Sequence, residues 1–394
     1  MTEIRQKPDF DNTRQAFAFR DTNELKRAVR FFRMIRSPWI SSMGQRALKI
    51  SLNLGLPVQG IVRKTLYKHF CGGETFEKSF PLVKRLAEYN VYAVLDYGVE
   101  GQTNEKEMNS AADEIISGIK AAKSEKFIPF AVFKATSVGY FSLYEKVTSG
   151  DELNQEQTKL WQNTRERIMN IFSTAYQYDV PVFVDAEESW IQKAIDSLVF
   201  EGMERFNEQK AVIWNTYQLY RHDHLAHLER QIQTAREKGF FLGAKLVRGA
   251  YLEKETKRAE DKGYENPVHT RKADTDRDYN QAVMACLENI DMTELCAATH
   301  NETTCRLLID EMENRNLASD DRRIWFSQLY GMCDFISFNL ADAGYNVAKY
   351  IPYGPLKAVL PYLLRRAEEN ASVQSQARRE LELLEKELER RKNN

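Results

Sequence analysis

The chain has 394 residues, of which 43% are hydrophobic and 29% charged, and its formal net charge is −1. This length suffices for an α/β barrel with terminal helices, and a nearly neutral chain has no global field that would attract nucleic acid. No run approaches the roughly 20 apolar residues of a membrane-spanning helix. The five cysteines form no CxxC pair, which predicts buried, reduced thiols and no zinc site.

Residues 1–89 are predicted to form a helical arm. Residues 1–20 mix acids with bases and contain no apolar stretch, which argues against a secretory signal or a mitochondrial presequence. Apolar residues then recur at helical spacing at Leu25, Val29, Phe32 and Ile35, and again at Leu48, Leu52 and Leu56. Basic residues interleave both stretches, but acids are mixed in, so a packed arm with a solvated face is favoured over a membrane-surface helix.

From residue 90 to 373, short apolar runs alternate with amphipathic helices, which is typical of parallel βα units. The predicted strands are Val91–Tyr97, Phe130–Lys134, Val180–Asp185, Ala211–Thr216, Gly243–Val247, Leu295–Thr299, Phe335–Phe338 and Lys349–Tyr353. Eight strands fit a closed (β/α)8 barrel better than an open sheet, and the sequence contains no GxGxxG motif of a Rossmann site. The stretch 136–179 is long for one unit and predicts an insertion or an extra helix.

Polar side chains end several of these predicted strands, namely Lys134, Asp185, Asn215, Arg248 and the pair Thr299-His300. A strand core has no packing use for such residues, and barrel enzymes place their active sites at the carboxyl ends of the strands. The pattern therefore predicts a site at this end of the barrel.

Two other polar features have simpler interpretations. The histidines at 222, 224 and 227 do not share one helical face, so they are predicted to be surface residues and no metal site is expected. Residues 374–394 are predicted to form an amphipathic helix with Leu381, Leu384 and Leu388 on one face. This helix would dock on its own barrel or on a partner subunit, and the first is favoured.

The most specific segments are Lys245–Tyr251, with the sequence KLVRGAY, and Tyr350–Pro355, with the sequence YIPYGP. In the first, an Arg-Gly pair directly after a strand indicates a close approach to the backbone. The second is followed by Tyr362 and the adjacent Arg365 and Arg366. Two guanidinium groups, each with a fork of donors, suit a carboxylate, although an exposed basic patch is the alternative.

These segments resemble the proline dehydrogenase family, and most closely its monofunctional, mitochondrial-type branch. The resemblance covers roughly residues 90–385 and is carried by residues 185–188, 215–218, 243–252, 299–301, 328–334 and 350–366, in that order. It implies a distorted (β/α)8 barrel with FAD at the carboxyl ends of the strands. It also implies oxidation of L-proline to 1-pyrroline-5-carboxylate by hydride transfer to the flavin, with a membrane quinone as the electron acceptor.

The resemblance also implies roles for single residues around the substrate. Arg365 and Arg366 would clamp the proline carboxylate, with Lys134 beside it and Glu369 supporting the pair. Tyr350 would pack on the proline ring. The apolar wall would be completed by Leu246, Leu329 and Tyr362. The candidate catalytic residues are Asp185, close to flavin and proline, and Lys245, beside the reactive nitrogen of the flavin.

For the cofactor, the resemblance implies contacts with Asp185, Ala186, Ile213, Asn215, Lys245, Val247, Gly249, Tyr251, Thr270, Arg271, Lys272, Thr299, His300 and Asn301. Two positions depart from a single family pattern. Lys245 stands where bacterial members usually carry arginine, and the mitochondrial-type branch resembles this chain in having lysine there. A cation is kept, but the bidentate geometry of arginine is not. The pair Arg271-Lys272, expected at the FAD phosphates, follows the bacterial pattern instead.

Three alternatives stay open from the sequence. Hydroxyproline oxidation would use the same scaffold, but the family carries tyrosine at the position of Tyr350 in proline enzymes and a smaller residue in hydroxyproline enzymes. Methylenetetrahydrofolate reductases bind flavin in a barrel but lack the double-arginine helix. A regulator that binds proline or DNA would be non-enzymatic. The expected location is the cytoplasm or the periphery of an inner membrane, mitochondrial in a eukaryote.

Overall fold

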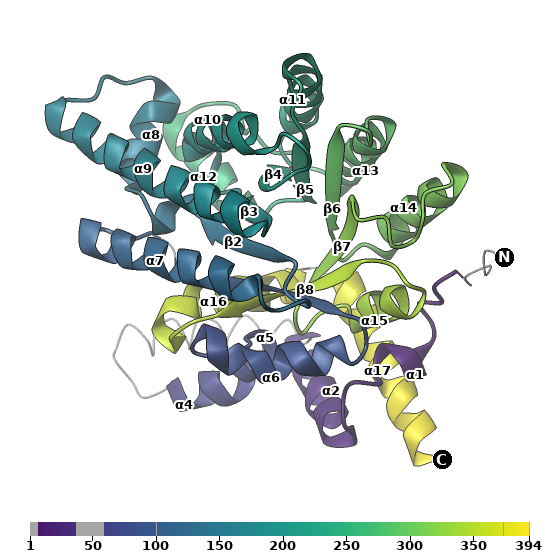
Figure 1. Ribbon diagram of the computed structural model, residues 1–394. Helices are drawn as coiled ribbons and strands as arrows, with labels where there is room; N and C mark the ends of the chain where they lie inside the picture. Colours follow the sequence, from purple (N-terminus) through teal and green to yellow (C-terminus); the bar gives the residue numbers. More distant parts are fainter. Residues whose placement is uncertain (1–6, 37–58, 100, 373, 394) are drawn as a thin grey trace.

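The computed structural model describes residues 7–36, 59–99, 101–372 and 374–393. Its centre is a closed, all-parallel barrel whose strands follow the chain order, which confirms the predicted (β/α)8 fold (Figure 1). The strands are β1 (Tyr92–Tyr97), β2 (Phe130–Lys134), β3 (Val182–Asp185), β4 (Ile213–Gln218), β5 (Leu242–Val247), β6 (Thr293–Ala298), β7 (Ile324–Leu329) and β8 (Val347–Tyr353). The barrel closes where β1 pairs with β8 along the whole of β1.

The predicted seventh strand is wrong. Phe335–Phe338 lies in the helix α15 (Asp334–Asp342), and the strand β7 comes earlier, at Ile324–Leu329. The apolar run belongs to a short helix that is buried on all sides, and a buried helix and a buried strand look alike in periodicity. The interior-facing side of β7 carries Trp325 and Ser327, which weakened its apolar signal.

Helices surround the barrel as an outer ring (Figure 1). β1 is followed by α7 (Glu105–Ala122), β2 by α8 (Phe141–Ser149) and α9 (Gln155–Tyr178), β3 by α10 (Ser189–Phe206), and β4 by α11 (His224–Lys238). β5 is followed by α12 (Leu252–Lys262) and α13 (Lys272–Glu288), β6 by α14 (Glu302–Asn314), and β7 by α15. The two helices α8 and α9 after β2 confirm that the stretch 136–179 contains an extra helix. The five cysteines are buried and free, as predicted.

The described parts of the N-terminal arm contain helices and pack against the barrel. These helices are α1 (Thr13–Ala16), α2 (Thr22–Arg36), α4 (Gln59–Val62), the π-helix η1 (Arg63–Tyr67), α5 (Lys68–Phe70) and α6 (Phe76–Ala87). The predicted helical stretch at residues 48–56 lies outside the described residues. Among the helices that the structure describes, none has both the length and the apolar character that crossing a bilayer demands.

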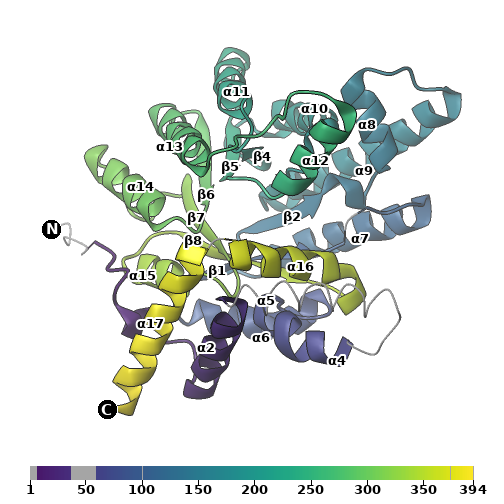
Figure 2. The ribbon, with the colours of Figure 1, turned by 180° about the vertical axis from the view of Figure 1, so that it is seen from behind.

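Two helices follow the last strand, α16 (Leu356–Ser372) and α17 (Gln374–Lys392). Seen from behind, α16 passes between the barrel and the arm, and α17 lies beside α2 (Figure 2). Leu381 and Leu384 of α17 are buried. The tail therefore docks on its own chain, but its main contact is the arm rather than the barrel that we expected. The boundaries at residues 89 and 373 stay predictions.

An aromatic layer fills the barrel at the amino ends of the strands. The rings of Phe130 and Phe183 stack with centroids 4.2 Å apart, and Trp214 and Trp325 meet Phe130 edge-on. Each of these residues is the first or second of its strand. Because the layer occupies the lower barrel, any site must lie above it, toward the carboxyl ends.

The docking of α17 generates a pH-dependent prediction. Burial, followed by the negative charge of Asp334, raises the pKa of Glu380 on α17 to about 8, against the opposing charges of Lys349 and Arg20. The folded chain therefore keeps a proton that the unfolded chain, with a pKa near 4.5, has lost. Stability should fall as the pH rises from about 5 to 8, by up to about 1.4 kcal/mol per pH unit. Glu380→Gln should flatten this slope in urea unfolding series, and equal slopes would contradict the assignment.

Candidate active site

A cavity of about 330 Å³ lies above the aromatic layer, at the carboxyl ends of the strands. Most of the residues predicted for the site line this cavity. They are Lys134, Asp185, Ala186, Lys245, Val247, Gly249, Tyr251, Lys272, Thr299, His300, Leu329, Tyr350, Tyr362, Arg365 and Arg366. They come from six strands and their loops and from α16. The structure therefore brings most of the predicted residues together around one space.

The carboxylate of Asp185 joins side chains from four strands at the centre of this cavity. It accepts a hydrogen bond from the Lys245 ammonium at 2.5 Å, from Lys134 at 3.1 Å and from the Tyr350 hydroxyl at 2.6 Å. The Lys245 nitrogen also lies 4.6 Å from the centre of the Tyr350 ring, a cation–π contact. The cluster is rigid because each member is held by at least one other.

The ionisation states in this cluster follow from burial and charge. Burial opposes ionisation of Asp185, but the charges of Lys245 and Lys134 outweigh it and hold its pKa below the usual range. Burial, together with the charge of Asp185, raises the pKa of Tyr350 well above its usual value. At neutral pH the carboxylate is therefore charged and the phenol is a hydrogen-bond donor.

A second carboxylate lies on the other side of Lys134. Asp96, from the end of β1, meets the Lys134 nitrogen at 3.2 Å and is buried. Burial and the nearby charge of Asp185 raise the pKa of Asp96, although Lys134 pulls it down. Asp96 lines the cavity and was not among the predicted residues. Its role depends on a partner on a neighbouring strand, which the local sequence does not reveal.

The two arginines come from α16, which lies over the cavity. Arg366 is buried, with its guanidinium carbon 5.2 Å from the centre of the Tyr362 ring, and Arg365 lies 5.9 Å from the Tyr251 ring. Aromatic faces therefore position both cations at the cavity wall. The helix also includes Glu369, whose side chain lies outside the described part of the chain.

Another group of cations lies where β5 and β6 end. Arg248 meets the Asp276 carboxylate at 2.7 Å and also bonds Thr299, and Lys272 binds the other oxygen of Asp276. Gly249 follows with a φ of +134°, and a Cβ there would lie 2.4 Å from the Tyr220 ring. Only glycine fits this backbone, as the predicted close approach requires. Arg248 lines the cavity too, and its strand-end position was the available signal.

His300 is neutral in this setting. Burial, followed by the positive charges of Lys349, Arg366 and Arg248, lowers its pKa to about 3. Its Nε2 accepts the backbone N–H of Leu329 at 3.0 Å. The lone pair of the ring is therefore already used, which assigns His300 a structural role at the cavity wall.

Apart from Glu369, whose side chain the structure does not describe, six predicted residues do not line the cavity. Leu246 and Ile213 belong to the apolar layer outside the barrel, and the Asn215 amide points outward to Asp196 at 3.0 Å. These three occupy outward positions of their strands, where side chains alternate. The others are Thr270, Arg271, which pairs with Asp274 on the surface, and Asn301, which caps α14.

Among the described residues, no group of three or more histidines, cysteines or acidic residues is placed to hold a metal ion, and this includes the histidines at positions 222, 224 and 227. One correction is needed, because His224 is buried rather than on the surface. Its Nδ1 accepts the backbone N–H of Gln218 at 3.1 Å. Gln218 itself lines the cavity, so this histidine supports the site from behind.

The central cluster makes a stability prediction. Asp185→Ala leaves two buried ammonium groups without their shared counter-ion, which should destabilise the chain by about 3–5 kcal/mol in urea unfolding. As a control, Asp291→Ala removes a carboxylate that pairs with Arg236 on the surface, and should have only a small effect. Equal losses in the two variants would show that Asp185 does not hold the lysines together.

Comparisons with known proteins agree with this geometry. Residues 81–379 match the family model described as proline dehydrogenase. The chain is 37% identical, over 84% of its length and 86% of the relative's, to the carbapenem antibiotics biosynthesis protein CarD of Pectobacterium carotovorum. It is 39% identical to the mitochondrial proline dehydrogenase 1 of Drosophila melanogaster, over 61% of this chain but only 37% of that one.

Among solved structures, proline utilization A of Bdellovibrio bacteriovorus, inactivated by N-propargylglycine, matches with a TM-score of 0.71 at 23% identity. The match covers 91% of this chain and 38% of the other, which shows the shared barrel fold. The likeness to a mitochondrial enzyme confirms the predicted branch. Because the family model matches most of this chain, residues 81–379, the chain belongs to the proline dehydrogenase family.

Proposed function

We propose that this chain oxidises L-proline to 1-pyrroline-5-carboxylate with a bound FAD, and that a membrane quinone takes up the electrons. The observation that carries the proposal is the arrangement of two arginines and an aromatic wall around a central cluster of two lysines and two aspartates. The family supports the substrate and a flavin cofactor. The quinone rests on the resemblance alone.

The donor groups of the cavity fit a flavin nucleotide. Arg248 and Lys272 already share one carboxylate, Asp276, where a phosphate group would find two cations. Gly249, which lines the cavity beside them, packs closely against the Tyr220 ring on its other side. Lys245 would place a positive charge at the ring system. When bound, the flavin supplies the two-electron acceptor that no side chain offers.

The charge and shape of the residues near α16 support the proposed binding of proline. Arg365 and Arg366 would bind the carboxylate, which fixes which carbon of the proline ring faces the flavin, a proximity effect. Tyr350 and Tyr362 would pack on the ring and exclude water. Glu369 would support the arginines. No base is assigned for the amine proton, because the Asp185 pKa is low and the His300 nitrogen is already bonded.

Hydroxyproline is the second candidate substrate, and Tyr350 argues against it. The hydroxyl of this tyrosine donates to Asp185 at 2.6 Å, which holds the ring against the cavity. An added hydroxyl on the substrate ring would have to fit against a side chain that cannot move away without losing this bond.

The function is tested by the absorption of the purified protein. It should be yellow, with a flavin band near ~450 nm that bleaches when L-proline is added anaerobically. Hydroxyproline at the same concentration should bleach the band much more slowly. A colourless protein, or a flavin that hydroxyproline reduces as fast as proline, would contradict the proposed cofactor or substrate.

The arginine assignment is tested by Arg366→Ala. It should raise KM for proline about 10- to 100-fold, as expected for the loss of a charged hydrogen bond worth about 1.5–3 kcal/mol, while flavin stays bound. Arg378→Ala, on the exposed face of α17, is the matched control and should leave KM unchanged. An unaltered KM in Arg366→Ala would exclude this residue from carboxylate binding.

A further inference from the structure

The loop that follows β7 forms part of the cavity wall in an unusual backbone conformation. Leu329 and Met332 line the cavity on either side of Gly331. Gly331 has a φ of +82°, and Cys333, which is not a glycine, has a φ of +51°. Glycine adopts this conformation without strain, but at Cys333 it is costly and persists only where surrounding groups hold it. Two sets of contacts from other parts of the chain hold residues 330–333.

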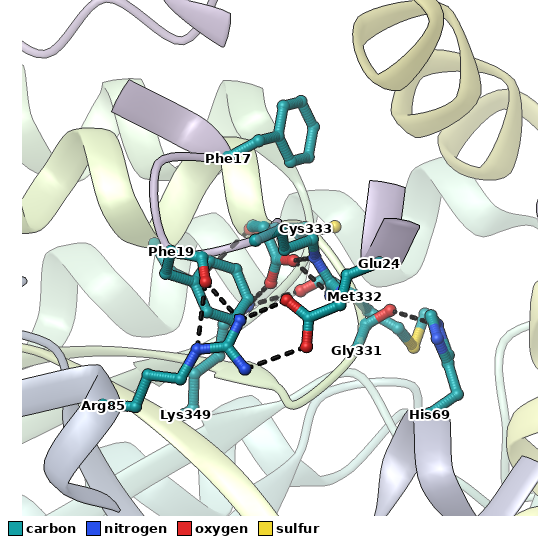
Figure 3. A network of polar contacts seen from close by, with 12 residues as sticks. Phe17, Phe19, Glu24, His69, Arg85, Gly331, Met332, Cys333 and Lys349 are labelled. Carbon is teal, nitrogen blue, oxygen red and sulfur yellow. Dashed lines mark hydrogen bonds and ion pairs between the residues drawn. The ribbon is translucent and has the colours of Figure 1, made fainter. Parts of the chain in front are cut away.

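One support comes from the N-terminal arm. The Nε2 atom of His69, in α5, lies 2.9 Å from the carbonyl oxygen of Gly331 (Figure 3). A carbonyl only accepts, so this nitrogen carries the proton and donates. Burial, followed by the charge of Arg20, lowers the pKa of His69 to about 3 and keeps the ring neutral. A Cβ on Gly331 would lie 2.5 Å from the backbone oxygen of His69, so the two segments are in direct contact.

A second support is a chain of buried charges behind the same loop. Lys349 points outward from β8 and its ammonium bonds the carbonyl of Met332 at 2.6 Å. The same ammonium lies 2.9 Å from Asp334, which in turn accepts two bonds from Arg20, just before α2, at 2.6 and 2.9 Å. Lys349 and Asp334 are almost completely buried. Arg20 thus reaches the loop through two charged residues.

The start of α2 is itself held in place beside Arg20. Arg85, on α6, donates to the carbonyl of Phe19 at 3.0 Å and to the carboxylate of Glu24 at 2.9 Å (Figure 3). The ring of Phe19 stacks on Phe338 of α15 with centroids 4.3 Å apart. The arm is therefore attached to the helix that follows the loop as well as to the loop.

From these contacts we infer that the N-terminal arm shapes the substrate wall, with His69 and Arg20 as positioning residues that hold Leu329 and Met332 at the cavity. Neither residue touches the cavity itself. Their effect reaches the substrate through the carbonyls of Gly331 and Met332. The inference rests on the proposed function, because it assigns this wall to proline binding.

The test is His69→Leu in the full-length, flavin-loaded protein. Leucine fills the space between Phe31 and Phe70 but cannot donate to Gly331. KM for proline should rise about 5- to 20-fold while kcat and the flavin content change less than twofold. The Kd of a proline analogue without an oxidisable amine should rise by the same factor, measured from the flavin spectrum. His69→Gln, whose amide can donate, should recover much of the affinity.

Arg33→Gln is the matched control, because it breaks an exposed ion pair between α2 and α17 that includes no residue of the loop. It should leave KM and Kd unchanged. If His69→Leu does not fold, Arg20→Lys carries the same test, since it keeps the charge but loses the two-pronged contact with Asp334.

A purely structural role for the arm would give a different result, namely a lower Tm with unchanged KM and Kd, and this would overturn the inference. Failure of the proposed function is distinguishable from this outcome. In that case the unaltered protein would itself show no reduction of flavin by proline.

Discussion

The site depends on one constraint: two lysine ammonium groups are held inside a barrel, and a single carboxylate, Asp185, lies between them. Like charges this close in a medium of low dielectric constant repel strongly unless a counter-ion is shared. Lys134 comes from β2, Lys245 from β5 and Asp185 from β3, and Tyr350 adds a bond from β8. The carboxylate therefore fixes four strands relative to one another, and with them the side chains that surround the cavity.

Alternation along the strands decides which residues could be predicted. Lys134 and Asp185 face inward at the ends of their strands, where a polar side chain has no packing use, so the sequence predicted their positions. Tyr350, in the middle of β8, was assigned by resemblance. Leu246 was assigned by resemblance, and Asn215 both by resemblance and by its place at the end of a predicted strand. Neither indication says toward which face of the strand the side chain points, and both side chains point outward. The seventh strand was missed because a fully buried helix, Asp334–Asp342, has a stronger apolar signal than a strand with Ser327 on its inner face. Contacts such as Asp96 with Lys134, or His69 with Gly331, join residues far apart in the chain, and no local pattern encodes them.

Strand β8 connects two parts of the molecule because its neighbouring side chains point in opposite directions. Tyr350 faces the cavity and bonds Asp185, whereas Lys349 faces outward and bonds Met332 and Asp334. A displacement of β8 would therefore disturb both the central cluster around Asp185 and the contacts with Met332 and Asp334. The arm, which reaches Asp334 through Arg20, is thereby connected to the central cluster by two consecutive residues of β8. Packing alone would not require charged groups here, and their desolvation is costly. Their presence is better explained by the conformation that they impose on the loop after β7.

The distribution of charge around the cavity agrees with a reaction that moves a hydride. At the centre, the two ammonium groups of Lys134 and Lys245 are matched by two carboxyl groups, those of Asp185 and Asp96. Positive groups lie at two sides of this centre, on α16 at Arg365 and Arg366 and beyond β5 at Arg248 and Lys272. Anionic parts of two ligands, a carboxylate and a phosphate, would be held at these sides, which leaves the balanced centre for the reacting atoms. Binding energy from groups remote from the chemistry is then used to align the reactants, and the centre needs no net charge to attract them.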